Sequence, residues 1–514
     1  MDDHNVPVDP PMHGLQDKGL RRGSVSLVGA VAIGLAATAP AYSLTGALGY
    51  ASLEVGYQLP IVFIISVIPM MFIALAYKHL TDAARDAGTV FTWGSKTIGP
   101  YVGWFGGWAL MLSSVLAGVG AAQIMVNASA VVLGLGEADL AFQLPVAAAF
   151  ILFTTWLVSL GAEESSRATL ILTVIQYGGL ALFAAILFSR VLQGNVGETV
   201  EAFSWSWFNP FAIESATALL GGFLVAIFIF WGFDASLAMS EETPGTAEQA
   251  GRSGVIAISI TVITYVIFAM AALSFAGIDP EDPTSLTYED NIDDVFTTLA
   301  TDSLTAGGAV VAALIVGMSA FSATMSTVLP TSRGLLAMAT YKALPGRFAS
   351  VSAATQTPRF ATWAVGLSTL AIYCGLSLVS DSVVEDSVYS VGIAIMTYYT
   401  VVALSSVVYF WRTAFRSVRT ALGQVILPGI GAVVMISAGL QEAYNMTDPE
   451  YGSGGSVAGI GTVFIVGVLT LLLGVPLMVV WRTRAPAFFR RETLPPERSS
   501  PEDLADPGSP SSRL

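Results

Sequence analysis

Long apolar stretches recur from residue 26 to residue 481, and they restrict the folds open to this chain more than any other feature. A helix that crosses a bilayer needs about 20 predominantly apolar residues. Membrane β-barrels show short segments of alternating polarity instead. The sequence therefore predicts an all-α polytopic membrane protein with twelve transmembrane helices. Their expected ranges are 26–50, 58–78, 100–134, 143–160, 168–190, 215–240, 253–277, 306–330, 360–379, 388–411, 421–440 and 457–481.

Composition agrees with a membrane protein and excludes several functions. Of the 514 residues, 54% are hydrophobic and 11% are charged, whereas soluble domains carry about 25% charged residues. The net charge of −15 excludes the basic surface of a nucleic-acid-binding protein. One cysteine, Cys374, and three histidines, His4, His13 and His79, are too few for a disulfide framework or for a haem or zinc cluster. The chain also lacks a P-loop and a catalytic-triad pattern, so we expect no cofactor, no metal and no enzyme activity.

The positions of the basic residues predict the orientation. With twelve spans, 21 of the 22 Lys and Arg residues fall on one side of the membrane, and only Arg190 falls on the other. The positive-inside rule then places both termini in the cytoplasm, in a protein of the cytoplasmic membrane. The opposite connections are acidic, at 277–305 (with Asp293) and at Asp381, Glu385 and Asp386. We interpret them as solvated loops, the alternative being a negative field that enriches cationic substrates.

The two ends of the chain differ in composition from the rest. Residues 1–25 and 482–514 are rich in Pro, Asp, Ser and charged residues, so we expect disordered cytoplasmic tails. Between them, the spans divide into a first five-helix unit at 26–190, a second at 215–411, and a last helix pair at 421–481.

Two of the twelve spans contain signals for a broken helix. Pro40 follows Ala37-Thr38-Ala39 in span 1 and lacks the N–H that a continuous helix needs. Span 6 contains Gly232, which allows a break. Because these spans are five apart, they run in opposite directions, as in an inverted repeat whose substrate site lies at the breaks. Each break alone is also compatible with a simple packing kink.

Several polar residues within spans are candidates for binding. Asp234 is an ionisable residue near the break of span 6, and such residues are functional candidates; the alternative is a carboxylate that caps the second half of a broken helix. Ser319 and Ser322 could line an ion site, although hydroxyls in membrane helices often bond to their own backbone. Gln123, Tyr398 and Tyr399 are open to the same two interpretations. Glu241 and Glu242 are expected in solvent at the cytoplasmic end of span 6.

The order of these motifs resembles the amino acid–polyamine–organocation (APC) family of secondary transporters over about residues 24–480. Four stretches carry the resemblance, and the spacing between them makes it fairly specific. They are the small-residue break in span 1; Gly88-Thr89-Val90-Phe91-Thr92-Trp93 followed by Gly99-Pro100-Tyr101-Val102-Gly103-Trp104; Gly232-Phe233-Asp234 ending in Glu241-Glu242-Thr243; and Ser332-Arg333-Gly334-Leu335-Leu336-Ala337 with Leu344-Pro345 and Pro358.

The resemblance implies a five-plus-five inverted repeat (the LeuT/APC-type fold) with broken helices 1 and 6. It implies that a substrate carboxylate meets backbone amides at Ala37, Thr38 and Ala39, with Tyr42 and Gln123 as further candidates. It also implies that the substrate amino group meets carbonyls at Phe230, Trp231 and Gly232, where the Phe230–Trp231 pair resembles a gate.

The chain departs from the family pattern at two positions. Many amino-acid permeases carry Gly-x-Gly in span 1, where this chain has Ala-Thr-Ala-Pro, which leaves an amine substrate open. Some proton-coupled members carry a lysine in span 5, near the position of Gln176 here, so H⁺ coupling through Asp234 and Na⁺ coupling both remain open.

These observations together predict a secondary transporter that imports amino acids or related amines by alternating access, as an ion-coupled symporter. The expected partners are the small-molecule substrate, H⁺ or Na⁺, and the lipid bilayer, with no nucleic acid. The alternatives are a polyamine or organocation carrier or exchanger on the same fold, and a channel or membrane sensor.

Overall fold

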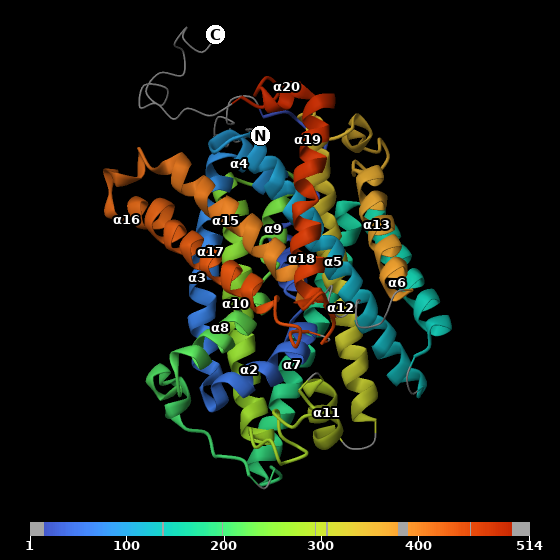
Figure 1. Cartoon of the computed structure of the whole chain (residues 1–514), viewed down its shortest axis with the longest axis vertical. Helices are drawn as coiled ribbons and strands as arrows, with labels where there is room; N and C mark the ends of the chain where they lie inside the picture. Colours follow the sequence, from blue (N-terminus) through green and yellow to red (C-terminus); the bar gives the residue numbers. More distant parts are fainter. Residues whose placement is uncertain are drawn as a thin grey trace, which may run out of the picture.

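The computed structural model describes residues 15–135, 138–197, 199–292, 294–304, 307–378, 389–452 and 454–495, and Figure 1 shows a bundle of long helices. Apart from short 3₁₀ turns, a π-helical turn at Leu422–Ile426 and a two-residue antiparallel pair, β1 (Ser456–Val457) and β2 (Ile460–Gly461), the regular structure in these ranges is α-helical. The helices of the first half are α1 (Leu27–Ala37), α2 (Pro40–Val55), α3 (Leu59–Ala83), α4 (Val90–Thr97), α5 (Pro100–Leu133), α6 (Leu140–Leu160), α7 (Ala162–Leu192), α8 (Ala216–Ile229) and α9 (Ala235–Ala238). Those of the second half are α10 (Ala247–Ala276), α11 (Val295–Leu304), α12 (Gly308–Thr340), α13 (Arg359–Ser377), α15 (Val391–Phe410), α16 (Val418–Ala421), α17 (Leu427–Asn445), α18 (Thr462–Leu472), α19 (Gly474–Arg484) and α20 (Pro486–Phe489).

The apolar helices confirm a polytopic membrane protein. Within the described ranges, ten helical segments are long and apolar enough to cross a membrane. One of them, Leu27–Ala83, has 57 residues and contains α1, α2 and α3, and the apolar helix Ala216–Ile229 (α8) is too short to be counted among the ten. The count of twelve spans stays a prediction.

Local signals explain where many of these helices begin. The side chains of Ser26, Asp139 and Ser215 accept hydrogen bonds from backbone N–H groups in the first turns of α1, α6 and α8. Thr246 and Gln249 form a capping box at the start of α10. Proline stands in the first turn of α2, α3 and α5, where its missing N–H would have no partner in the helix.

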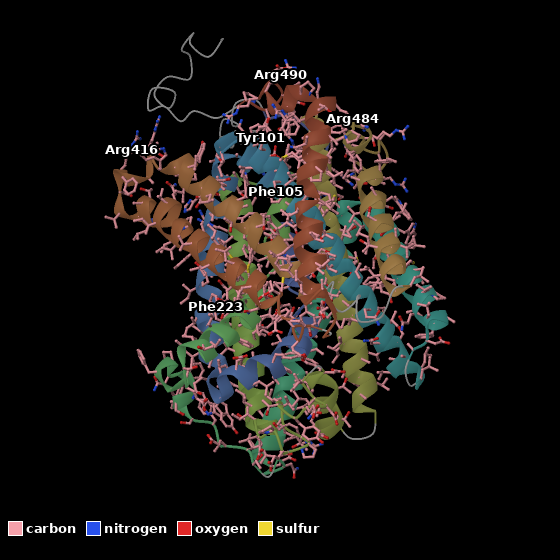
Figure 2. The ribbon with its side chains drawn as sticks, viewed as in Figure 1. Tyr101, Phe105, Phe223, Arg416, Arg484 and Arg490 are labelled. Atoms are coloured by element: carbon pink, nitrogen blue, oxygen red, sulfur yellow. The ribbon has the colours of Figure 1, made fainter. Side chains whose placement is uncertain are left out.

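The bundle has two distinct ends, with the broken helices between them. In Figure 1, α4, α19 and α20 lie at the upper end, and α2 and α11 lie toward the lower end. Figure 2 places the labelled arginines Arg416, Arg484 and Arg490 at the upper end, as the partition of basic residues in the sequence predicts for one side of the membrane.

Parts of both chain ends are folded, which corrects the expectation of disorder for 15–25 and 482–495; residues 1–14 and 496–514 lie outside the described ranges. Lys18 is buried, and helix α19 extends to Arg484. Tyr341, at the end of α12, contacts both segments, because its hydroxyl accepts from the Gln16 N–H (3.1 Å) and its carbonyl accepts from the Thr493 hydroxyl (2.6 Å). These contacts join residues far apart in sequence, so composition could not indicate them.

An aromatic cluster adds to the contacts of the C-terminal segment. The ring of Phe488 in α20 stacks on Phe91 (5.4 Å between centroids), and the ring of Phe489 lies 5.2 Å from that of Tyr101. Leu494 is also buried in this cluster. The burial of these side chains holds residues 486–494 against α4 and α5.

Three carboxylates of the acidic connection before α12 accept hydrogen bonds from the backbone of that connection. Asp279, Asp282 and Asp294 accept hydrogen bonds from backbone N–H groups two or three residues later, at 2.9–3.1 Å. These three carboxylates therefore stabilise turns within the connection itself. Asp293, Asp381, Glu385 and Asp386 lie outside the described residues.

Candidate functional site

The first break separates α1 from α2 at Thr38 and Ala39. Ala39 has left-handed backbone angles (φ 46°, ψ 62°), and Pro40 begins α2. A non-glycine residue in this conformation costs about 1–2 kcal/mol. Two hydroxyls hold the break in place, since Thr38 Oγ1 donates to the Leu35 carbonyl and Ser43 Oγ donates to the Thr38 carbonyl, both at 2.7 Å.

The second break separates α8 from α9 and touches the first. Gly232 has φ 111°, a conformation that favours glycine. A methyl group on Gly232 would lie only 2.6 Å from the carbonyl carbon of Ala37. Glycine is therefore required here both by the backbone conformation and by the close approach of the two broken segments.

A tyrosine from a third helix bridges the two breaks. The hydroxyl of Tyr265, in α10, lies 3.1 Å from the Thr38 carbonyl and 3.1 Å from the Ile229 carbonyl. Its single proton serves two acceptors, one at each break. A second group of hydroxyls, from Tyr177 (α7) and Thr261 (α10), lies within 3.5 Å of Thr38 Oγ1. The broken segments thus have a fixed arrangement relative to α7 and α10.

A cavity lies between the breaks and the helices α5 and α12; we call it the first cavity. A second cavity adjoins it. Trp231, Ala37 and Thr327 line both, and the indole N–H of Trp231 donates to the Tyr398 hydroxyl. Trp231 therefore forms part of the wall between the first cavity, which Tyr42 and Phe228 also line, and the second cavity.

Asp234 lines the second cavity and is bonded to tyrosines from two helices. Its carboxylate accepts from Tyr399 (2.8 Å), Tyr398 (3.3 Å) and Tyr77 (3.3 Å). No salt bridge between described residues includes Asp234, and within the same ranges its side chain does not cap α9. A buried carboxylate with hydroxyl partners can accept a proton or attract a cation.

The structure places the sequence-predicted residues in three groups. Ala37, Thr38, Ala39, Tyr42 and Trp231 line the first cavity, and Gly232 and Asp234 line the second cavity together with Ala37 and Trp231. The ring of Phe230 instead packs against Phe63 and Tyr265 (centroids 6.4 and 5.4 Å away). The side-chain oxygen of Gln123 accepts a hydrogen bond from the Tyr373 hydroxyl in α13, and Gln123 is not among the residues that line the two cavities.

Two of the amides that the resemblance implies for a substrate carboxylate are already bonded within the chain. The N–H groups of Thr38 and Ala39 donate back to the Gly34 and Ala36 carbonyls of α1. Since Pro40 has no N–H, Ala41 and Tyr42 provide the amide donors of the first turn of α2. The Tyr42 N–H lies 3.3 Å from Ser319 Oγ, whereas Ser322 Oγ is buried without a hydrogen-bond partner among the described residues.

Sequence reasoning missed Tyr77, Tyr265 and Tyr177. Each is a tyrosine inside an apolar helix, and a buried phenol usually has a hydrogen-bond partner. That rule marks them as residues to inspect, but only the fold shows that their partners are Asp234 and the two breaks.

The expectation that Glu241 and Glu242 lie in solvent is wrong. Glu242 is fully buried and paired with Arg333 of α12 at 2.8 Å, and Glu241 pairs with Lys18 at 2.6 Å. Lys18 also pairs with Asp86 at 2.7 Å. We call Lys18, Asp86, Glu241, Glu242 and Arg333 the ionic network. It connects the end of span 6 to three other parts of the chain, which are the N-terminal segment, the loop after α3, and helix α12.

Within the ionic network, the neighbouring carboxylates favour the charged form of Lys18. Burial alone would lower the pKa of Lys18, but the carboxylates of Asp86 and Glu241 together raise it above its ordinary value. Burial raises the pKa of Glu241, and Lys18 opposes this shift. Lys18 therefore keeps its charge at any physiological pH and neutralises carboxylates that would otherwise be buried alone.

Comparison with known proteins agrees with this geometry. A family model described as amino acid permease matches residues 25–469. The chain belongs to the amino acid permease family. The resemblance predicted from the motif order is thereby confirmed, and the family and its relatives are transporters rather than enzymes.

Individual relatives of this permease differ in what their names say they carry. It is 28% identical over 403 residues to the vacuolar cationic amino acid transporter 2 of Arabidopsis thaliana, covering 73% of this chain and 58% of the relative. It is 26% identical over 348 residues to the branched-chain amino acid permease BcaP of Bacillus subtilis (62% and 67% covered). It is 23% identical over 416 residues to the methylthioribose transporter of the same bacterium (78% and 82% covered). The match spans less than two thirds of the length of the plant relative.

Proposed function

We propose that this permease is a secondary transporter that moves an amino acid or related amine across the cytoplasmic membrane by alternating access. The observation that carries the proposal is the contact between two broken spans, Ala37 against Gly232, beside a cavity. Broken helices that meet in this way form the substrate sites of many secondary transporters.

The two breaks offer opposite partial charges to a zwitterion. The N-terminus of α2, with the amides of Ala41 and Tyr42, attracts a carboxylate, whereas the C-terminus of α8, at Phe230, Trp231 and Gly232, attracts an ammonium group. Tyr42 and Trp231 line the first cavity. In the proposed mode the substrate therefore lies in the first cavity with its charged ends toward α2 and α8.

Movement between two states follows from the proposed repeat. We assign α1–α7 to the first five-span unit and α8–α15 to the second, inverted unit, within a twelve-span chain. The broken helices then open each unit, and rocking of one unit against the other exposes the cavity to alternate sides. The arginines at the upper end in Figure 2 support placing that end, with both termini, in the cytoplasm.

We propose H⁺ as the coupling ion and Asp234 as its carrier. Asp234 is 8% exposed, so binding of a proton to its carboxylate would remove a buried charge. When Asp234 is ionised, the hydroxyls of Tyr399, Tyr398 and Tyr77 donate to it. Na⁺ held near Ser319 and Ser322 is the alternative that the experiment must separate.

Uptake by purified protein in proteoliposomes tests the proposal. A panel of labelled amino acids and polyamines is offered with an inward H⁺ gradient, an inward Na⁺ gradient or neither. Accumulation of an amino acid above empty vesicles only with the H⁺ gradient supports the proposal. Counterflow with preloaded substrate is expected for a carrier or exchanger and not for a channel. If no member of the panel accumulates and none shows counterflow, the proposed transport function is overturned.

A further inference from the structure

The charge of the cavity lining restricts what the permease can carry. All twelve residues that line the first cavity are uncharged. Away from the breaks, its wall is formed by Ala117 and Ala121 of α5, by Ala323, Thr324 and Thr327 of α12, and by the ring of Phe228. The hydroxyls of Thr324 and Thr327 donate to carbonyls of their own helix. Ala117 and Ala121 are four residues apart and so lie on one face of α5. We call Ala117, Ala121 and Ala323 the alanine wall; it is apolar, and the lining of the cavity offers no carboxylate.

The carboxylate at the site belongs to the other cavity. Asp234 lines the second cavity, and Trp231, held by its hydrogen bond to Tyr398, stands between the two spaces. The oxygens of Asp234 are already engaged by Tyr399, Tyr398 and Tyr77. A cationic side chain in the first cavity would lose its hydration with no countercharge in the lining, which is strongly unfavourable.

The same lining disfavours a linear polyamine. Such a molecule carries a cation at each end, and in the first cavity it would place at least one of them against an uncharged wall.

We propose that the substrate is a zwitterionic amino acid with an uncharged, apolar side chain, and that Ala117, Ala121 and Ala323 receive this side chain. This inference rests on the proposed function and narrows its substrate class. It excludes cationic amino acids and polyamines as good substrates, although the vacuolar relative is named for cationic amino acids.

A direct comparison of substrates is the first test. Proteoliposomes under one H⁺ gradient receive labelled leucine, arginine or putrescine at equal concentration. We expect initial leucine uptake at least tenfold faster than uptake of arginine or putrescine. Equal or faster arginine or putrescine uptake would overturn this inference and leave the proposed transport function standing, whereas no uptake of any compound would overturn both.

Binding without transport gives a second readout. Leucine at millimolar concentration is expected to raise the Tm of the detergent-solubilised permease, and arginine and putrescine are expected to leave it unchanged. A larger rise with arginine would overturn the inference even if reconstitution abolished transport.

A matched pair of variants tests the alanine wall itself. Ala121→Glu and Ala121→Gln add side chains of nearly equal volume, but only the glutamate adds a carboxylate. We expect Ala121→Glu to increase arginine uptake, or arginine-induced stabilisation, at least tenfold over Ala121→Gln. If both variants elute as folded protein and treat arginine alike, the side chain of the substrate does not lie at this wall.

Discussion

The carbonyl group of Ala37 lies against Gly232, so closely that a single methyl group on Gly232 would come within 2.6 Å of it. This contact joins the break of one span to the break of another, about 195 residues further along the chain. Both partners are backbone, which leaves little freedom to relax around an added atom.

Gly232→Ala should therefore destabilise the permease and abolish uptake. The positive φ alone costs about 1–3 kcal/mol for a residue other than glycine, and the contact with Ala37 adds to this cost. Thermal unfolding in detergent and leucine uptake would measure both effects. Gly375→Ala in α13 is the matched control, because its added methyl meets nothing within 4 Å; equal behaviour of the two variants would contradict the tight contact.

Asp234→Asn should separate transport from the H⁺ gradient. The amide keeps the size of the side chain and can still accept from Tyr399, but it cannot bind and release a proton at physiological pH. We expect gradient-driven accumulation to fall at least tenfold, with substrate counterflow retained. Initial rates between pH 5 and 8 provide the measurement.

The control for Asp234 is another buried carboxylate with a tyrosine partner. Glu442 of α17 is 2% exposed and accepts from Tyr451 at 2.6 Å, outside both cavities. Glu442→Gln should keep the pH dependence of the wild type. If Asp234→Asn also keeps it, Asp234 does not carry the proton.

Tyr265→Phe should weaken the link between the two breaks without disturbing ring packing. The phenyl ring can keep its contact with Phe230, 5.4 Å between centroids, while the Thr38 and Ile229 carbonyls lose their shared donor. Loss of one such hydrogen bond costs about 0.5–1.5 kcal/mol, so the Tm should fall only slightly while uptake falls several-fold.

A loop tyrosine serves for comparison with Tyr265. The hydroxyl of Tyr57 accepts from the Glu201 N–H at 2.9 Å, and its ring stacks on Trp207. Tyr57→Phe removes a comparable bond away from the breaks and should leave uptake unchanged. Equal loss of uptake in both variants would argue against a special role of Tyr265.

Lys18→Met should destabilise the upper end of the bundle strongly. It leaves the carboxylates of Asp86 and Glu241 buried without their cation, and breaking a buried pair in this way costs about 3–5 kcal/mol. We expect a clear fall in Tm and increased thiol labelling of a cysteine placed at Ser240. Further substitution of Asp86→Asn and Glu241→Gln in the same chain should restore much of the Tm.

An exposed salt bridge of the same segment provides the contrast. The side chain of Arg22 is 85% exposed where it pairs with Asp17 at 3.7 Å, and such surface pairs contribute about 0–1 kcal/mol. Arg22→Met should leave both Tm and labelling unchanged. A similar loss in both variants would show that burial of the Lys18 pairs does not matter.

The sequence predicted those features that depend on a local rule. Pro40 removes a helical donor and Gly232 permits a positive φ, so both breaks could be located without a structure. Asp234 was identified because a carboxylate in an apolar span is costly. The apolar runs predicted the helical bundle because a helix that crosses a bilayer needs about 20 predominantly apolar residues.

Features that depend on distant partners were not accessible in this way. Lys18 and Glu241 are separated by 223 positions, and nothing in their neighbouring residues indicates that they pair. Gln123 looked suitable for a binding site because of its type and span, yet its side chain bonds to Tyr373, 250 positions away. A rule based on residue type recognises a polar side chain but does not identify the helix that it faces.

Tyr341 contacts segments near both ends of the chain, through Gln16 on one side and Thr493 on the other. Fraying of a protein normally begins at its ends, where few contacts oppose it. Here the first and last described segments share one residue with the end of α12, so either segment must give up bonds to the bundle before it can peel away. The segments around Gln16 and Thr493 thus belong to one cooperative unit with the bundle, and a chain shortened to its apolar spans would lose part of that unit at each end.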